Sequence, residues 1–194
     1  MKLNEVQKPK QYPNSIANFS KWVKIRDSGE WNPRRLGRDL DCNRERLKSI
    51  EGSPVIVAGS FNCSFNLLET LKGAPRKVGN NFNCSDNLLT SLEYAPEYTN
   101  GMFFATRNKI TNLKDIHKQI KSIGSTFWID GNPIKSHVLG LLLIKSLISV
   151  VADTTSTFRM PAFDIINRHL EKDKDVLECQ EELISSGFKE YAKL

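Results

Sequence analysis

Four cysteines are the side chains of this 194-residue chain best suited to metal or redox chemistry, and three of them are evenly spaced. Cys42, Cys63 and Cys84 follow one another at intervals of 21 residues, and Cys179 lies far beyond them. Thiolate metal sites usually draw on short Cys-x-x-Cys pairs, and this spacing contains none. A disulfide within the evenly spaced set would leave one thiol over, and residues 1–13 hold no apolar signal-peptide stretch. We therefore expect buried thiols that act as small apolar side chains, with no metal and no cofactor.

Other catalytic constellations are weakly represented, so we expect a protein that is not an enzyme. The three histidines, His117, His137 and His169, fall in no zinc-binding or triad-like motif, and the chain has neither a phosphate-binding glycine loop nor a nucleophile elbow. The spacing of Cys179 from Val176 and Leu183 places it on the apolar face of a predicted helix. A catalytic cysteine of a ubiquitin ligase is the alternative, but the tail is too short for such a domain.

The residues around the evenly spaced cysteines repeat with them. The frame is apolar, x, Cys, small polar, x, Asn, x, Leu, x, x, Leu, followed by x, x, a small residue, Pro, x, x and Val. Its clearest copies span 61–78 and 82–99, and an earlier copy has Glu45 in place of Asn. Two further copies begin at Phe103 and, after a three-residue insertion, at Phe127.

A period of 20 to 29 residues with this frame is the signature of a leucine-rich repeat, in which each turn contributes one short parallel strand and a return segment. The predicted fold is an α/β solenoid of about five such turns. The apolar and Cys positions point inward, and the Asn side chain can satisfy backbone groups where the chain leaves the strand. Equivalent residues of adjacent turns should lie about 4.8 Å apart, so the cysteines should form a column.

The chain divides into three segments within one compact unit: a basic N-terminal helical cap (1–39), the solenoid (40–134) and a C-terminal helical cap (135–194). The first segment holds nine Lys and Arg against four Asp and Glu, so nearly all of the net charge of +6 is N-terminal. Within it, an amphipathic helix is predicted from Asn14 or Ser15 to Gly29. In the third segment, helices are predicted over 136–151, over 161–170, and from Asp173 or Asp175 to Gly187.

The repeat resembles the short leucine-rich repeats of bacterial effector proteins. It is more similar to a class of uncharacterised tailed-bacteriophage proteins, whose unit Gly-x-Phe-x-Cys-Ser-x-Asn-x-Leu-x-Ser-Leu-x-Gly-Ala-Pro-x-x-Val is matched closely by residues 61–99. The segments beginning at Gly131 and Glu178 also resemble the tails of such proteins. The resemblance covers about residues 40–194 and implies a fold and a phage origin, but no activity.

Function is predicted to reside on the outward-facing strand positions, because a repeat scaffold is shared by proteins with many functions. Alternation of side chains places large apolar residues there beside cations, a composition typical of protein interfaces. The predicted partner-binding residues are Phe65, Leu67, Leu88, Phe104, Arg107 and Trp128, flanked by Arg44, Arg46 and Lys109. The partner would be a host or a phage protein. The alternative is that the N-terminal or C-terminal segment folds over part of this surface.

Two other functions stay open. Nucleic acid could bind the basic N-terminal segment through Lys21, Lys24, Arg34, Arg35 and Arg38, with nearby tryptophans for stacking. The chain could also be a minor virion component. The longest apolar run, 138–151, is too short to span a bilayer, so we expect no membrane association. We also expect a monomer, located in the cytoplasm of a bacterial host.

Overall fold

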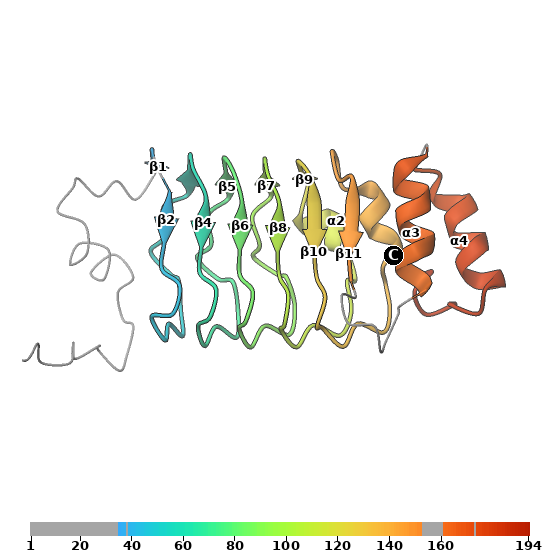
Figure 1. Ribbon diagram of the computed structural model, residues 1–194, viewed down its shortest axis with the longest axis horizontal. Coiled ribbons are helices and arrows are strands. Elements are labelled where there is room, and N and C mark those ends of the chain that lie inside the picture. Colours follow the sequence, from blue (N-terminus) through green and yellow to red (C-terminus); the bar gives the residue numbers. More distant parts are fainter. Residues whose placement is uncertain (1–34, 38, 153–160, 173) are drawn as a thin grey trace, which may run out of the picture.

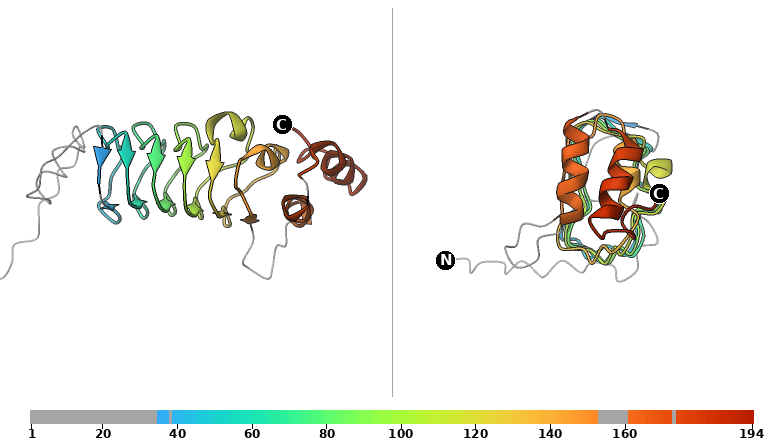
Figure 2. Two further views of the ribbon diagram at one scale, coloured as in Figure 1. Left: turned by 90° about the horizontal axis from the view of Figure 1, so that it is seen from above. Right: turned by 90° about the vertical axis from the view of Figure 1, so that its right-hand side faces the viewer.

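The chain folds into a stack of coils that is followed by helices (Figure 1). The computed structural model describes residues 35–37, 39–152, 161–172 and 174–194. Successive turns lie side by side along a nearly straight axis, and the helices α3 (Pro161–Glu171) and α4 (Val176–Ser185) lie at the C-terminal end of the stack (Figures 1 and 2). The predicted α/β solenoid of about five parallel-strand turns is confirmed. The predicted N-terminal cap helix lies outside the described residues.

A six-stranded parallel sheet forms one face of the stack, in the order β11-β10-β8-β6-β4-β2. Its strands are β2 (Leu40–Asp41), β4 (Phe61–Asn62), β6 (Phe82–Asn83), β8 (Phe103–Phe104), β10 (Thr126–Trp128) and β11 (Ser149–Val151). The register places Phe61 opposite Phe82, and Phe82 opposite Phe103. The 21-residue period of the sequence therefore corresponds to one complete turn of the solenoid.

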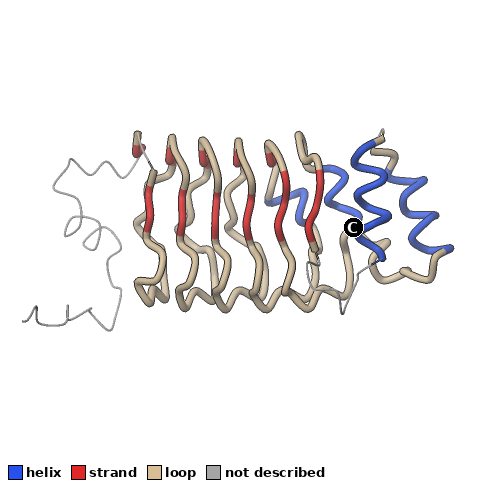
Figure 3. Tube along the Cα trace, viewed as in Figure 1, coloured by secondary structure: helices blue, strands red, loops and turns tan. Residues whose placement is uncertain are grey.

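A second, five-stranded parallel sheet runs along the stack, in the order β1-β3-β5-β7-β9 (Figure 3). Its strands are β1 (Arg35–Leu36), β3 (Ile56–Val57), β5 (Lys77–Val78), β7 (Tyr98–Thr99) and β9 (Ser122–Ile123). The repeat frame predicts only a return segment here, and these strands were not predicted. A strand of two residues is too short to show the alternation of apolar and polar residues that identifies longer ones.

The interior of the stack is built from columns of identical or similar side chains. The ring centroids of Phe61 and Phe82 lie 5.8 Å apart, those of Phe82 and Phe103 4.9 Å, and those of Phe103 and Phe127 5.1 Å. These rings are fully buried. The evenly spaced cysteines form a parallel column and their side chains are buried, as predicted. Each turn thus buries its apolar side chains only by lying against the turns before and after it.

The frame asparagines connect neighbouring turns by hydrogen bonds. The Asn87 side-chain oxygen accepts from the Leu68 N–H of the preceding turn at 3.0 Å. Its amide nitrogen donates to the carbonyls of Cys63 in that turn, at 3.1 Å, and of Cys84 in its own turn, at 3.0 Å. The same bridge is made by Asn66, Asn108 and Asn132. The predicted role of the asparagine is confirmed, and the structure adds that it joins two turns at once.

The three-residue insertion before Phe127 is absorbed outside the stack. The extra residues lie near α2 (Ile116–Gln119), a short helix that projects from one side (Figure 2). Phe127 still pairs with Phe103 in the sheet. An insertion placed in the return arm therefore leaves the sheet register unchanged.

The helix predicted over 136–151 is wrong. The segment forms a 3-10 helix, η1 (Leu139–Leu143), and then the strand β11. Ser146 has a left-handed φ of 60°, which interrupts any helix, and β11 pairs with β10 so that Val150 lies opposite Phe127. The exposed edge of β10 offers unpaired backbone groups, and pairing with them outweighs a local helical pattern. The first residues of the predicted C-terminal helical cap thus add a sixth strand to the sheet.

The two predicted helices that follow are confirmed. Pro161 is the first residue of α3, and Asp175 caps α4 by accepting from the N–H groups of Leu177 and Glu178. Gly187, with a φ of 86°, follows the end of α4 in the left-handed conformation that glycine adopts readily.

A side-chain amide of α3 lies against the last strand of the six-stranded sheet. Asn167 accepts from the Val150 N–H at 2.7 Å and donates to the Val150 carbonyl at 2.8 Å. These are the bonds that a further strand would supply to β11. Asn167 therefore occupies the edge at which the sheet would otherwise continue.

Replacing Asn87 with Ala should destabilise the fold by about 3 kcal/mol, because it leaves the buried Leu68 N–H and two carbonyls without their partner. Urea unfolding followed by circular dichroism measures this. The matched control is Asn80→Ala, an exposed position for which we expect a change within about 0.5 kcal/mol. Equal effects of the two variants would contradict the bridging role.

Replacing Asn167 with Leu should expose the β11 edge and produce concentration-dependent association, since an uncovered edge pairs with other strands. Size-exclusion chromatography with light scattering, over a range of protein concentrations, detects it. Glu171→Leu adds the same apolar side chain at an exposed position of α3 and should leave the apparent mass unchanged. An Asn167→Leu protein with the same apparent mass as the wild type at every concentration would refute the edge role.

Candidate functional site

The outward-facing residues of the turns form regular rows, because hydrogen bonds between turns hold them in register. The Arg44 N–H donates to the Ser64 carbonyl at 3.1 Å, and the Phe65 N–H donates to that of Ser85 at 3.0 Å. Asp86 and Arg107 continue the same series. The predicted row of residues just before the frame asparagine therefore exists as a column on the surface.

Every member of this column has a left-handed backbone. The φ angles are 56° at Arg44, 54° at Phe65, 55° at Asp86, 50° at Arg107 and 69° at Gly131. This conformation is uncommon outside glycine. Gly131 is the only glycine among these positions, so residue type alone does not indicate the repeated left-handed conformation.

Two predicted binding residues are the most exposed apolar side chains of the set. Phe65 is 44% exposed and Leu67 is 38% exposed, on a backbone bonded to the turns on both sides. The Arg44 guanidinium lies over the Phe65 ring at 4.6 Å from its centroid, a cation–π contact that limits the motion of both side chains. Leu88 lies in the next turn and is half-buried.

The predicted residues Phe104 and Trp128 form a second apolar group. They lie opposite each other on β8 and β10, and their rings stack with centroids 6.0 Å apart. Both are half-buried, and the Trp128 indole nitrogen is enclosed without a hydrogen-bond partner among the described residues. This pair is therefore less accessible than Phe65 and Leu67.

Arg107, also predicted to bind, is engaged within the chain. Its guanidinium forms a two-pronged ion pair with Asp86, with nitrogen–oxygen distances of 2.6 and 2.7 Å. Hydrogen bonding to this carboxylate raises the pKa of Arg107. The predicted set is thus divided into the apolar group Phe65, Leu67 and Leu88 and the ring pair Phe104 and Trp128, while Arg107 is paired with Asp86 in the row that also contains Phe65.

The first outward row carries asparagines whose role sequence analysis did not anticipate. The Asn62 side-chain oxygen accepts from the Ser64 N–H at 3.2 Å and from its hydroxyl at 2.7 Å, and Asn83 accepts from the Ser85 N–H at 3.0 Å. The Asn-x-Ser spacing is the signal that predicts such turns. These amides satisfy local backbone groups, so Phe65 and Leu67 are the more available contacts.

The residues predicted for nucleic-acid binding fall almost entirely beyond the described ranges. Lys21, Lys24, Arg34 and Arg38 lie outside them, and Arg35 is described only as part of the backbone of β1. The described residues therefore provide no side-chain positions with which to assess nucleic-acid binding.

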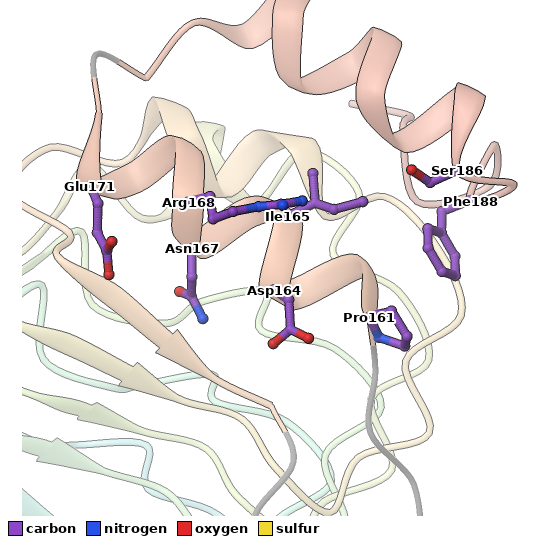
Figure 4. A pocket seen from close by; sticks show the side chains of 8 residues that line it. All are labelled: Pro161, Asp164, Ile165, Asn167, Arg168, Glu171, Ser186 and Phe188. Carbon is purple, nitrogen blue, oxygen red and sulfur yellow. The ribbon is translucent and has the colours of Figure 1, made fainter.

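An open depression lies at the C-terminal end, between α3 and the turn that follows α4 (Figure 4). Its lining includes Arg168, which forms an ion pair with Glu182 of α4. The buried His169 contacts the same carboxylate through Nε2 at 2.8 Å, and this hydrogen bond, with the nearby Arg168 charge, lowers the pKa of Glu182. The cluster joins α3 to α4, which is a structural role.

The described residues include no group of three or more potential metal ligands among His, Cys, Asp and Glu. Within the same ranges, no helix is sufficiently long and apolar to cross a membrane.

Comparisons with protein-family models, with curated proteins and with solved structures gave no match.

Because the thiols are buried, they should react with Ellman's reagent only after unfolding. Desolvation raises the pKa of Cys63 and Cys84, and raises that of Cys179 to about 12. At about pH 8, the native protein should therefore show almost no fast-reacting thiol, and all four should react in urea. The same shifts favour the folded state fully below the ordinary thiol pKa of about 8.5, and this contribution is lost as the pH rises above it. A fast-reacting native thiol in the column would contradict its assignment to the core.

Proposed function

We propose that the protein is a non-enzymatic protein-binding module that contacts its partner through the exposed strand face. The observation that carries this proposal is the exposure of Phe65 and Leu67, at 44% and 38%, on a rigid backbone beside arginines. Exposed apolar and aromatic groups accompanied by Arg mark protein interfaces, and a rigid scaffold loses little entropy on binding.

The partner is a host or phage protein, and the setting is the cytoplasm of a bacterial host. This part of the proposal is supported by the resemblance of residues 61–99 to phage repeat proteins. The leucine-rich-repeat assignment has the same support, together with the frame of Asn and Leu positions.

Nucleic-acid binding ranks second, because its support is a charge excess in the first 39 residues. That excess is nine cations against four anions. The strand face, by contrast, offers apolar side chains in described positions, which favour a protein partner.

The test is affinity capture with quantitative mass spectrometry, from cells in which the gene is naturally expressed. The double variant Phe65→Ser, Leu67→Ser should recover the partner at least about tenfold less well than the wild type, as expected when central apolar contacts are lost.

The matched control is Val55→Ser, Leu177→Ser, which removes two apolar side chains that are 50% and 71% exposed away from the strand face. It should recover the partner normally. Recovery of the same proteins by both folded variants and the wild type would refute a role for the strand face.

A further inference from the structure

We infer that the strand face takes an acidic peptide segment with apolar residues between its carboxylates; this inference rests on the proposed protein-binding function. The surface concerned is here called the basic–apolar strip. It consists of Arg44, Arg46, Phe65, Leu67, Leu88 and Lys109.

The strip has cations at both ends and apolar side chains at its centre. Arg46 belongs to the first complete turn, Leu67 and Leu88 to the next two, and Lys109 to the fourth. Hydrogen bonds from the Leu67, Leu88 and Lys109 N–H groups to the preceding turns, each 2.8 Å, hold this row in register. At about 4.8 Å per turn, Arg46 and Lys109 are separated by roughly 14 Å.

This separation specifies the spacing of the carboxylates in the ligand. An extended peptide rises about 3.3 Å per residue, so two carboxylates about four residues apart would reach both ends of the strip. The residues between them would lie over Leu67 and Leu88. The expected ligand is therefore a short segment with Asp or Glu on both sides of two or three apolar residues.

The terminal cations of the strip lack a carboxylate partner within the described part of the chain. Arg44, Arg46 and Lys109 form no ion pair there, whereas Arg107 in the adjacent row is paired with Asp86. Arg44 rests on the Phe65 ring, which holds its guanidinium in place and leaves its N–H donors free for a carboxylate. The strip thus combines uncompensated positive charge with exposed apolar surface.

An acidic peptide fits this combination better than single-stranded nucleic acid does. Nucleic acid requires stacking platforms at successive positions, and the centre of the strip carries the aliphatic side chains of Leu67 and Leu88. A second copy of the strip would oppose its own cations.

The experiment is selection of a displayed random 12-residue peptide library on the full-length protein. We expect enriched peptides to carry Asp or Glu on both sides of Leu, Ile, Phe or Trp. Enrichment of peptides without acidic residues, or no enrichment above the empty support, would overturn the inference.

The selected peptides are then measured by fluorescence polarisation against charge-reversed variants. Arg46→Glu, Lys109→Glu should weaken binding about tenfold or more, and higher salt should weaken binding to the wild type. Lys145→Glu, Lys189→Glu makes the same change in net charge at exposed positions elsewhere and should retain affinity. Equal losses in the two variants would overturn the inference.

These experiments distinguish an error in the inferred partner, an acidic peptide, from an error in the proposed protein-binding function. If the enriched peptides lack acidic residues but lose binding in the Phe65→Ser, Leu67→Ser variant, the partner class is wrong and the strand-face function stands. If that variant binds every selected peptide normally, the strand face is excluded as the binding site.

Fluorescence polarisation with labelled oligo(dT) tests nucleic-acid binding as the alternative. Tighter binding of oligo(dT) than of the peptides through Arg46 and Lys109 would also overturn the inference.

Discussion

The asparagine bridge is the interaction on which the rest of the structure depends. A solenoid of two- and three-residue strands has few backbone hydrogen bonds per turn, and the chain must leave each strand through a bend whose polar groups are buried. Asn87 satisfies groups of two turns at this bend with one side chain. Because the same bridge recurs at Asn66, Asn108 and Asn132, the bends superimpose, and the inward columns and outward rows follow from that alignment.

The alignment of the bends also determines the backbone conformation of the outward-facing rows. The residue before each bridging asparagine adopts a left-handed conformation, and so does Arg44 before Glu45; of these residues only Gly131 has the freedom of glycine. Such backbone conformations cost of order 1 kcal/mol each and persist where the surrounding structure imposes them. The bends that stabilise the core therefore also determine which side chains are exposed to solvent.

Sequence periodicity was sufficient for the solenoid, the buried cysteine column and the role of the asparagine, because each repeat position recurs in the same environment. It failed at 136–151, where an apolar run fits a buried helix and a strand equally well, and where pairing with β10 decides between them. For the site, alternation identified the outward residues, including Phe65 and Leu67. It did not reveal that Asp86 neutralises Arg107 or that Phe104 and Trp128 are half-buried, since these depend on side-chain contacts between turns.

The position of Asn167 bears on how the length of such a protein can change. Each turn contacts mainly its neighbours, and the stack stops where a helix offers one amide in place of another strand. Whole 21-residue units can therefore be gained or lost from the middle of the chain without altering the residues that end the sheet. Deletion or duplication of units would change the length of the exposed strand face while preserving the spacing between its rows. The length of this face can therefore evolve separately from the stability of the C-terminal end of the stack.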